Sequence, residues 1–340
     1  MAAISNDPRV SFQTGKTHKQ NAVVLEEVEG IIRVYKDGYV ERFPVVPSVS
    51  CAVASELGVV AKDAVIDKFT NLWARIYAPI RHGKPLPVVV YFHGGGFCVG
   101  SAAWGCYHDF LANLASKAGC VVISVNYRLA PENRLPASYD DGRNAVLWVR
   151  QQALEGSREQ QWWLGRCHFS SLYLAGDSAG ANIAHNVATR LSSDIGTVFL
   201  SPLFLKGTIL IQPFFGGEAR TRSEKLSQQP ANSVLSLAAS DAYWRLSLPA
   251  GAGRDHPWSN PLSKGAASCG VKSMMVCIAE MDILKDRNLE FCAAMAAEGK
   301  RVEKVVYRGV GHAFQILHNV QLSQARTQEL MSHLKAFINQ

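Results

Sequence analysis

The segment 176–180 reads Gly-Asp-Ser-Ala-Gly and places a serine between two glycines. An apolar run at 171–175 precedes it and a helical pattern at 181–188 follows it, so the segment predicts a strand, a sharp turn and a helix with Ser178 at the apex. Such a turn exposes the hydroxyl at the end of a sheet and directs a helix N-terminus toward it. Ser178 is therefore the predicted nucleophile, and an ordinary tight turn with a spectator serine is the alternative.

A run of three glycines follows a predicted strand in His93-Gly94-Gly95-Gly96. Without side chains in the way, backbone N–H groups of such a loop can point into a site. The N–H groups of Gly94 and Gly95, together with that of Ala179, could hold an oxyanion. We expect Gly96 and the side chain of His93 to be structural parts of the loop. Glycine runs also form plain tight turns.

A serine nucleophile needs a base, and the base needs a carboxylate that orients it. His312 lies in a loop with two nearby glycines after the last predicted strand, where an imidazole could reach over the end of a sheet. His318 and His333 belong to, or adjoin, helical stretches and are poorer candidates. His312 is therefore the predicted base.

Three carboxylates lie within eight residues after the predicted strand 274–278, and all three precede His312 in the chain. Asp282 is the best candidate for the third member of a triad, because we expect a helix to begin near Ile283 and a carboxylate is favoured at a helix N-terminus. Glu280 and Asp286 remain alternatives. We expect Asp177 to stabilise the elbow or to line a pocket rather than to orient the histidine.

The rest of the chain predicts an α/β fold with a mostly parallel central sheet and helices on its faces, because strands and helices alternate. Near-continuous β-branched runs are typical of strands that are buried on both faces. The expected strands are 31–35, 39–43 (a hairpin with the first), 71–77, 87–92, 120–125, 171–175, 207–211, 274–278 and 302–307. The expected helices include 106–118, 137–154 and 321–338.

Two regions depart from this rhythm, and we expect both to form a cap. Residues 215–265 are rich in Gly, Ser, Pro and Arg and contain a helical stretch at 240–246, which is typical of an insertion that covers a site. The N-terminal residues 1–26 are expected to be flexible or to contribute to the same cap, within a single domain that spans 1–340. Seven aromatic side chains could line an apolar pocket or belong to the core: Phe97, Trp104, Tyr107, Phe214, Phe215, Tyr243 and Trp244.

Composition excludes several classes of protein. The chain is 48% hydrophobic and 19% charged, as globular proteins are, and no apolar stretch is long enough to cross a membrane. The net charge of +7 is dispersed, without the basic runs of a nucleic-acid-binding protein. Eight scattered cysteines without C-x-x-C pairs indicate reduced thiols in the cytoplasm, with the nucleus as a further compartment.

Taken together, these motifs resemble the hormone-sensitive-lipase branch of the α/β-hydrolases, and the whole pattern is similar to plant carboxylesterases, the relatives of the gibberellin receptor. The resemblance extends from about residue 27 to the end of the chain. The segments that carry it are 93–96, 126–132, 176–182 and 311–314, joined by 214–218 and 243–246. The order Ser178, Asp282, His312 is also the order in such enzymes.

The resemblance implies a serine carboxylesterase that cleaves short or medium acyl esters through an acyl-enzyme, with a small-molecule ester substrate and no metal or cofactor. We expect a monomer or weak homodimer. A non-catalytic hormone receptor is one alternative, and His312 argues against it because the receptor lacks the catalytic histidine. A lyase or dehydratase of a specialised plant metabolite is another, and Ser178 argues against it because such enzymes often have threonine there.

Overall fold

The computed structural model describes residues 23–53, 55–80, 83–193, 200–226, 233–317 and 320–340. The chain divides into two compact units, Met1–Phe43 and Pro44–Gln340. In the first unit, β1 (Val24–Val28), β2 (Ile32–Tyr35) and β3 (Val40–Arg42) form an antiparallel sheet, which confirms the predicted hairpin. Residues 1–22 lie outside the described residues. The prediction that the N-terminal region belongs to a single domain and caps the site stays a prediction.

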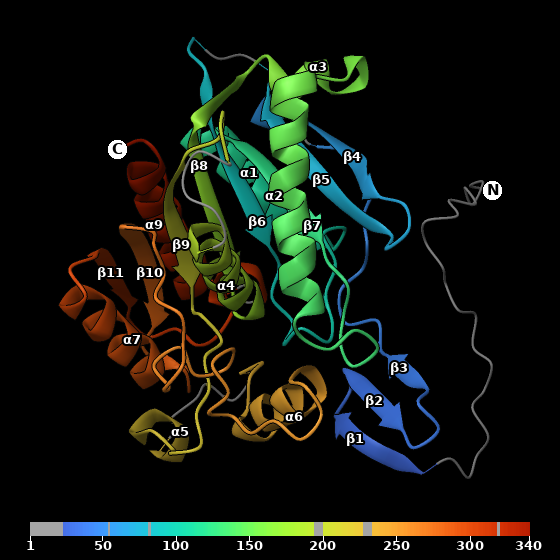
Figure 1. The fold of residues 1–340 in the computed structure, drawn as a ribbon, viewed down its shortest axis with the longest axis vertical. Helices are drawn as coiled ribbons and strands as arrows, with labels where there is room; N and C mark the ends of the chain where they lie inside the picture. The colour runs from blue at the N-terminus through green and yellow to red at the C-terminus, as the bar shows by residue number, and fades with distance from the viewer. Residues whose placement is uncertain (1–22, 54, 81–82, 194–199, 227–232, 318–319) are drawn as a thin grey trace. The chain divides into compact units, whose positions relative to one another are not determined.

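The second unit is built on an eight-stranded sheet in the order β11-β10-β9-β8-β6-β7-β5-β4 (Figure 1). The six strands from β6 to β11 pair in parallel, and β5 and β4 extend one edge antiparallel. The strands are β4 (Val59–Asp67), β5 (Leu72–Pro79), β6 (Leu86–Phe92), β7 (Val121–Asn126), β8 (Cys167–Asp177), β9 (Leu205–Ile211), β10 (Ser273–Ala279) and β11 (Arg301–Tyr307).

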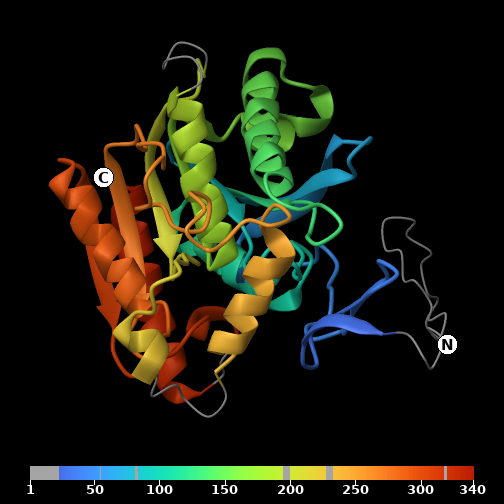
Figure 2. The same ribbon diagram turned by 60° about the horizontal axis from the view of Figure 1, so that its bottom comes forward.

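Helices cover both faces of this sheet. α1 packs with α9 on one face and α2 packs with α4 on the other (Figures 1 and 2). The helices are α1 (Gly105–Ala118), α2 (Ala137–Glu155), α3 (Gln161–Leu164), α4 (Ala179–Ser193), α5 (Arg222–Leu226), α6 (Leu237–Ser247), α7 (Lys285–Ala297), α8 (Phe314–Leu317) and α9 (Gln321–Ile338), with short 3₁₀ turns at Ser55–Leu57 and Arg158–Gln160. The layered arrangement confirms the predicted α/β-hydrolase architecture.

The central strands lie in the core because their side chains are apolar on both faces. All seven residues of β6 are buried, and so are the last seven of β8. Val89 and Tyr91 face the layer that contains α1 and α9. Burial of a valine side chain contributes about 1.5–3 kcal/mol, so these strands form a rigid base for the loops at their carboxyl ends.

The insertion between β9 and β10 contains α5 and α6. The predicted helical stretch at 240–246 is confirmed by α6, where the Oγ of Ser236 accepts the N–H of Ala239 at 3.1 Å and so caps the helix. Charged pairs hold the insertion together: Asp241 on α6 pairs with Arg220 and Arg254, and Arg254 pairs with Glu218. In the described part of the chain, no helix has the length and apolarity needed to span a membrane.

Candidate active site

Ser178 lies at the junction of β8 and α4, where the chain turns sharply. Its φ of 52° is in the left-handed region, which is strained for a residue with a Cβ atom. The turn is held by two backbone hydrogen bonds: the N–H of Ser178 donates to Ile211 O at 2.8 Å, and the N–H of Phe214 donates to Ser178 O at 3.0 Å. The backbone of Ser178 is therefore held in place at the end of the sheet, and this fixes the position from which its hydroxyl extends.

The two flanking glycines are required by the close approach of the chain segments at this turn. A Cβ atom at Gly180 would overlap the carbonyl group of Phe92 at the end of β6, and a Cβ at Gly176 would overlap the backbone of Gly180. Only glycine lets backbone approach backbone this closely. The spacing of the motif thus follows from packing α4 against β6 and β8.

His312 lies between Ser178 and Asp282. Its Nε2 is 2.9 Å from the Oγ of Ser178, and its Nδ1 is 2.6 Å from the Oδ2 of Asp282. The imidazole comes from the loop between β11 and α8, and the carboxylate comes from the loop between β10 and α7. All three side chains are buried, with exposed fractions of 7%, 4% and 3% for Ser178, His312 and Asp282. The three residues predicted as nucleophile, base and acid are therefore brought together.

The backbone that follows β10 orients Asp282. Its Oδ1 accepts the N–H of Leu284 at 3.0 Å, which leaves Oδ2 for the imidazole. The helix expected near Ile283 begins at Lys285, with Leu284 as the residue that caps it. Asp282 thus lies just before the helix rather than on it.

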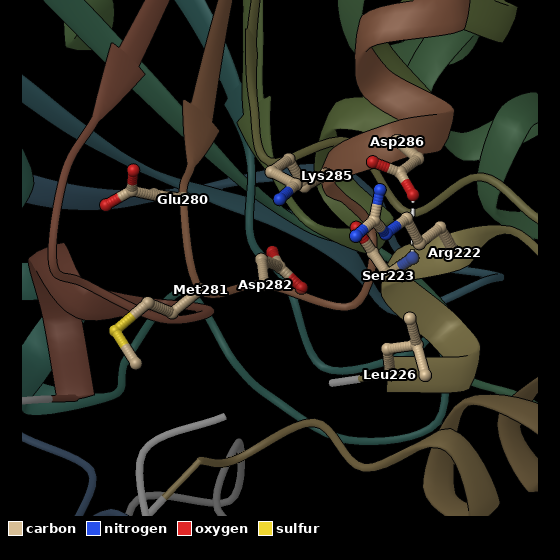
Figure 3. A pocket seen from close by; sticks show the side chains of 8 residues that line it. All are labelled: Arg222, Ser223, Leu226, Glu280, Met281, Asp282, Lys285 and Asp286. Carbon is tan, nitrogen blue, oxygen red and sulfur yellow. Dashed lines mark hydrogen bonds between the residues drawn. The ribbon is translucent and has the colours of Figure 1, made fainter. Parts of the chain in front are cut away.

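The two alternative carboxylates have other partners. Glu280 accepts the N–H of Gly309 at 2.9 Å, and Asp286 accepts the N–H of Ser223 at 2.6 Å. A cavity of about 500 Å³ lies beside Asp282 and separates these side chains (Figure 3). Its lining residues are Arg222, Ser223, Leu226, Glu280, Met281, Asp282, Lys285 and Asp286.

The N–H of Gly94, which was predicted as an oxyanion donor, has partners inside the protein. This N–H donates to the hydroxyl of Tyr107 at 2.7 Å and to Oδ1 of Asp177 at 3.1 Å. It is therefore already used inside the protein. A Cβ atom at Gly94 would lie 3.1 Å from the Cβ of Ser178, so the glycine loop does lie directly beside the serine.

Three other backbone N–H groups near Ser178 remain available to donate a hydrogen bond to a bound molecule. Among the residues that the structure describes, the N–H groups of Gly95, Gly96 and Ala179 donate no hydrogen bond. Gly95 and Gly96 both have positive φ, at 111° and 59°, a conformation that glycine adopts without strain. The ring of Tyr243 on α6 lies so close to Gly96 that a Cβ there would overlap it. The insertion therefore contacts the glycine loop.

Asp177 is the centre of a buried network, in line with the predicted role in stabilising the elbow, although its tyrosine partners were not predicted. The hydroxyl of Tyr91 donates to its Oδ1 at 2.8 Å, and the hydroxyl of Tyr107 donates to its Oδ2 at 3.0 Å. Burial raises the pKa of Asp177 to about 6, although the two tyrosine hydrogen bonds oppose this shift. The network ties the glycine loop to the elbow. The one signal for it in the sequence is a tyrosine hydroxyl inside the apolar strand β6.

His93 has a structural role, as predicted. Its ring stacks on Tyr127 with centroids 4.3 Å apart, and its Nδ1 lies 2.8 Å from the carbonyl oxygen of Gly94. Burial lowers the pKa of His93 to about 4, so the ring is neutral at physiological pH. Behind the loop, Phe214 stacks on Trp244 at 4.5 Å and both contact Phe97; all three are almost fully buried and belong to the core.

Within the described ranges, no group of three or more His, Cys, Asp or Glu side chains is arranged to hold a metal ion. The chemistry available at this site is that of a serine hydroxyl, an imidazole, a carboxylate and backbone N–H groups. This combination suits nucleophilic attack on an electrophilic carbon and stabilisation of the negative oxygen that results.

A serine on a strand–helix elbow above a mostly parallel sheet defines the α/β-hydrolase class. The comparison with family models agrees, since residues 89–316 match a family described by the alpha/beta hydrolase fold. The chain belongs to this family.

Known relatives include both a carboxylesterase and a hormone receptor. A probable carboxylesterase of Arabidopsis thaliana is 50% identical over 322 residues, which cover 93% of this chain and 92% of the relative. A gibberellin receptor of the same plant is 38% identical over 277 residues, which cover 75% of this chain and 72% of the receptor. Among solved structures, a thermostable carboxylesterase cloned from a metagenomic library has a TM-score of 0.68 at 27% identity, covering 86% of this chain and 89% of that one.

Proposed function

We propose that this protein is a serine carboxylesterase that hydrolyses short or medium acyl esters through an acyl-enzyme intermediate. The observation that carries the proposal is the position of His312, with Nε2 2.9 Å from the hydroxyl oxygen of Ser178 and Nδ1 2.6 Å from the carboxylate of Asp282. The similarity to carboxylesterases over most of the chain supports the same reaction.

In the proposed first step, the Oγ of Ser178 attacks the ester carbonyl carbon while Nε2 of His312 takes the hydroxyl proton. Asp282 accepts a hydrogen bond from Nδ1–H, which holds the imidazole in the tautomer whose Nε2 is free to act as a base. The tetrahedral intermediate then breaks its bond to the alcohol oxygen. His312 returns the proton to the departing alcohol, and the acyl group remains on Ser178.

The negative oxygen of the intermediate needs nearby donors. We propose the N–H groups of Gly95, Gly96 and Ala179, because these have no partner among the described residues whereas that of Gly94 has two. Gly96 thus replaces Gly94 in the predicted set. Removal of one such donor typically slows an enzyme by about 10²–10³.

In the second step, water attacks the acyl carbon while His312 again takes a proton. The tetrahedral intermediate then breaks its bond to the Oγ of Ser178 and releases a carboxylic acid, while His312 returns the proton to the Oγ. These steps need only the side chains and backbone groups named above, so the proposal includes no metal ion or cofactor.

We infer a preference for short acyl chains from the packing around the glycine loop. Tyr243 lies against Gly96, and the neighbouring Phe97, Phe214 and Trp244 are almost fully buried in contact with one another. A series of p-nitrophenyl esters tests this inference. Rates should be highest from acetate to butyrate, and a maximum at ten or more acyl carbons would contradict it.

We also propose a reducing compartment, the cytoplasm, for this protein, and a monomeric or weakly dimeric state. The cysteines support the first point, because all eight are free thiols. Imaging of a fluorescent fusion tests the location. Size-exclusion chromatography with light scattering at several concentrations tests the oligomeric state.

Hydrolysis of p-nitrophenyl butyrate by wild type and by Ser178→Ala tests the proposed function. Loss of the nucleophile is expected to reduce kcat by about 10⁶, the scale seen for serine hydrolases, with the unfolding midpoint little changed because only one hydroxyl is removed. Turnover by Ser178→Ala near the wild-type rate would exclude Ser178 as the nucleophile. A wild-type protein that hydrolyses no ester in the series would exclude the esterase itself.

A further inference from the structure

We propose that Gln212 is a positioning residue for His312, within a segment at the end of β9, Ile211–Phe214, that fixes the three loops of the triad relative to one another. The inference rests on the proposed esterase function. Each residue of this segment makes a hydrogen bond to an element that carries a triad member or adjoins the loop that carries one.

The segment first fixes the nucleophile. Ile211 accepts the N–H of Ser178 at 2.8 Å, and Phe214 donates its N–H to the carbonyl of Ser178 at 3.0 Å. Both polar backbone groups of the serine are thus satisfied by residues that flank Gln212. Any shift of the segment would move the elbow with it.

The side chain of Gln212 then fixes the histidine loop. Its Oε1 accepts the N–H of Ala313, the residue directly after His312, at 2.6 Å. Its Nε2 donates to Oε1 of Gln315 at 3.3 Å. Gln212 is 1% exposed, and both Gln212 and Ala313 have a positive φ, at 48° and 57°. Two strained residues therefore meet through one short hydrogen bond, which is typical of a conformation that the surrounding structure must hold in place.

The elements before and after the Asp282 loop are joined to the same segment by two further hydrogen bonds. The N–H of Gln212 donates to the carbonyl of Cys277 on β10 at 2.7 Å, and Asn288 donates from Nδ2 to the carbonyl of Pro213 at 2.8 Å. Asn288 is 1% exposed and lies in the first turn of α7, just after the Asp282 loop. The strand before Asp282 and the helix after it are thus both fastened to the segment.

These contacts require the amide group of the Gln212 side chain. An apolar residue of the same length would keep the packing but leave the buried N–H of Ala313 without an acceptor, and the histidine loop would shift to find one. A displacement of about 1 Å at reacting groups can cost about 100-fold in rate. Gln212 touches neither substrate nor reacting atoms in this account, so its effect acts through His312.

Gln212→Met is the variant that tests the proposal, with Gln160→Met as its control. Gln160 accepts a hydrogen bond of similar length, 2.7 Å, from Nε1 of Trp163, but it lies before the start of β8 whereas Ser178 follows its end. For Gln212→Met on p-nitrophenyl butyrate we expect kcat to fall about 10- to 100-fold with KM within about threefold, and Gln160→Met to match wild type.

The pH profile separates positioning from a general loss of stability. When the imidazole moves away from Asp282, its protonated form loses a neighbouring negative charge, so the acidic limb of kcat/KM should move to lower pH in Gln212→Met.

A second variant, Gln212→Glu, keeps an acceptor for the N–H of Ala313. Its kcat should be at least about tenfold higher than that of Gln212→Met. If Gln212→Met does not fold, Gln315→Leu carries the test, because it removes only the bond to Nε2 of Gln212 and should lower kcat about two- to fivefold.

Wild-type kcat and an unmoved pH limb in folded Gln212→Met would overturn the proposal, as would unchanged kcat in Gln315→Leu if that variant carries the test. A folded Gln212→Glu that is no faster than Gln212→Met would also overturn it. Failure of the esterase proposal is distinguishable, since wild type itself would then be inactive on every ester. In that case the rate at which a fluorophosphonate labels Ser178 still compares wild type with Gln212→Met, and equal rates would overturn the role of Gln212.

Discussion

Two buried aspartates belong to the site around Ser178, and they hold different parts of it. Asp282 faces the Nδ1 of His312 and the N–H of Leu284. Asp177 faces the hydroxyls of Tyr91 and Tyr107 and the N–H of Gly94. The carboxylate next to the serine in sequence therefore fastens the glycine loop, and the one 104 residues away contacts the base. Nearness in sequence says little about which carboxylate can reach the imidazole.

The partners also give the two carboxylates different electrostatic surroundings. Asp177 is bound by neutral hydroxyls and a backbone N–H, and burial dominates its pKa, which rises to about 6. Asp282 faces a group that becomes a cation during the proposed reaction, so its negative charge is needed when His312 holds the proton. Substitution of each aspartate by asparagine should therefore have different effects on turnover and on stability.

The largest expected difference is in turnover by Asp282→Asn. An amide at this position would favour the wrong imidazole tautomer, so kcat on p-nitrophenyl butyrate should fall by about 10⁴ with KM near the wild-type value. A loss of less than about tenfold would show that another group orients His312.

Asp177→Asn should reduce kcat by about 10- to 100-fold, which is less than Asp282→Asn. The amide would place N–H atoms opposite a tyrosine hydroxyl, which loosens the glycine loop but leaves His312 and its carboxylate in place. The effect should therefore stay at or below the loss of about 10²–10³ that follows the removal of a whole oxyanion donor. Steady-state kinetics of both variants side by side measure the difference. A larger loss in Asp177→Asn would reverse the roles assigned to the two carboxylates.

Stability should also depend on pH through Asp177. Its pKa in the folded protein is about 6, above the 3.8 of an ordinary aspartate, so the folded state binds this proton more tightly than the unfolded state. The resulting stabilisation is complete well below pH 3.8 and is lost as pH rises through 6, by about 3 kcal/mol in all for a shift of about two units.

Urea unfolding at pH 4 and pH 7 measures this effect, with Asp177→Asn as the reference that lacks the titrating group. Between these two pH values, the free energy of unfolding of wild type should fall by about 2.4 kcal/mol more than that of the variant. Equal pH dependence in the two proteins would mean that Asp177 titrates normally.

The smallest effects are expected for the two remaining carboxylates. Glu280→Gln and Asp286→Asn each keep an oxygen that can accept the N–H of Gly309 or Ser223, and neither side chain contacts His312. Turnover should stay within about threefold of wild type, because only exposed or half-buried hydrogen bonds change. Should either variant lose more activity than Asp282→Asn, the third member of the triad would be misassigned.

Most of the fold was predictable because the central strands are long apolar runs. β6, β7 and β10 are buried on both faces, and their boundaries lie within about two residues of the predicted ones. β4 was missed because charged residues such as Lys62 and Asp63 interrupt its apolar pattern. It forms because it pairs with β5 at the edge of the sheet, where one face meets solvent.

The features that could not be predicted from the sequence depend on contacts between residues that are far apart in the chain. The helix α5 is only five residues long and is held by a buried ion pair between Glu224 and Arg287 of α7, 2.7 Å apart. Likewise, nothing in the glycine run indicates that the N–H of Gly94 meets Tyr107 of α1 and Asp177. The role of Gln212 depends on the histidine loop, 101 residues further along the chain.

The elbow and the triad were more accessible to sequence reasoning. The glycines at 176 and 180 are demanded by local backbone packing, so they appear as a short motif. Asp282 follows the buried strand β10 and His312 follows the edge strand β11, and both strands are parallel to β8, so their carboxyl ends lie at the same edge of the sheet. The topology of parallel strands, rather than any local pattern, brings these loops together.

The most direct test of the central claim is to locate the covalent adduct of a fluorophosphonate by peptide mass spectrometry in wild type and in His312→Ala. A nucleophile activated by His312 should give one modified peptide in wild type, with the phosphonyl group on Ser178, and labelling should be slower by about 10³ or more in His312→Ala because the base is lost. An adduct on another residue, or equally fast labelling of Ser178 in both proteins, would contradict the account.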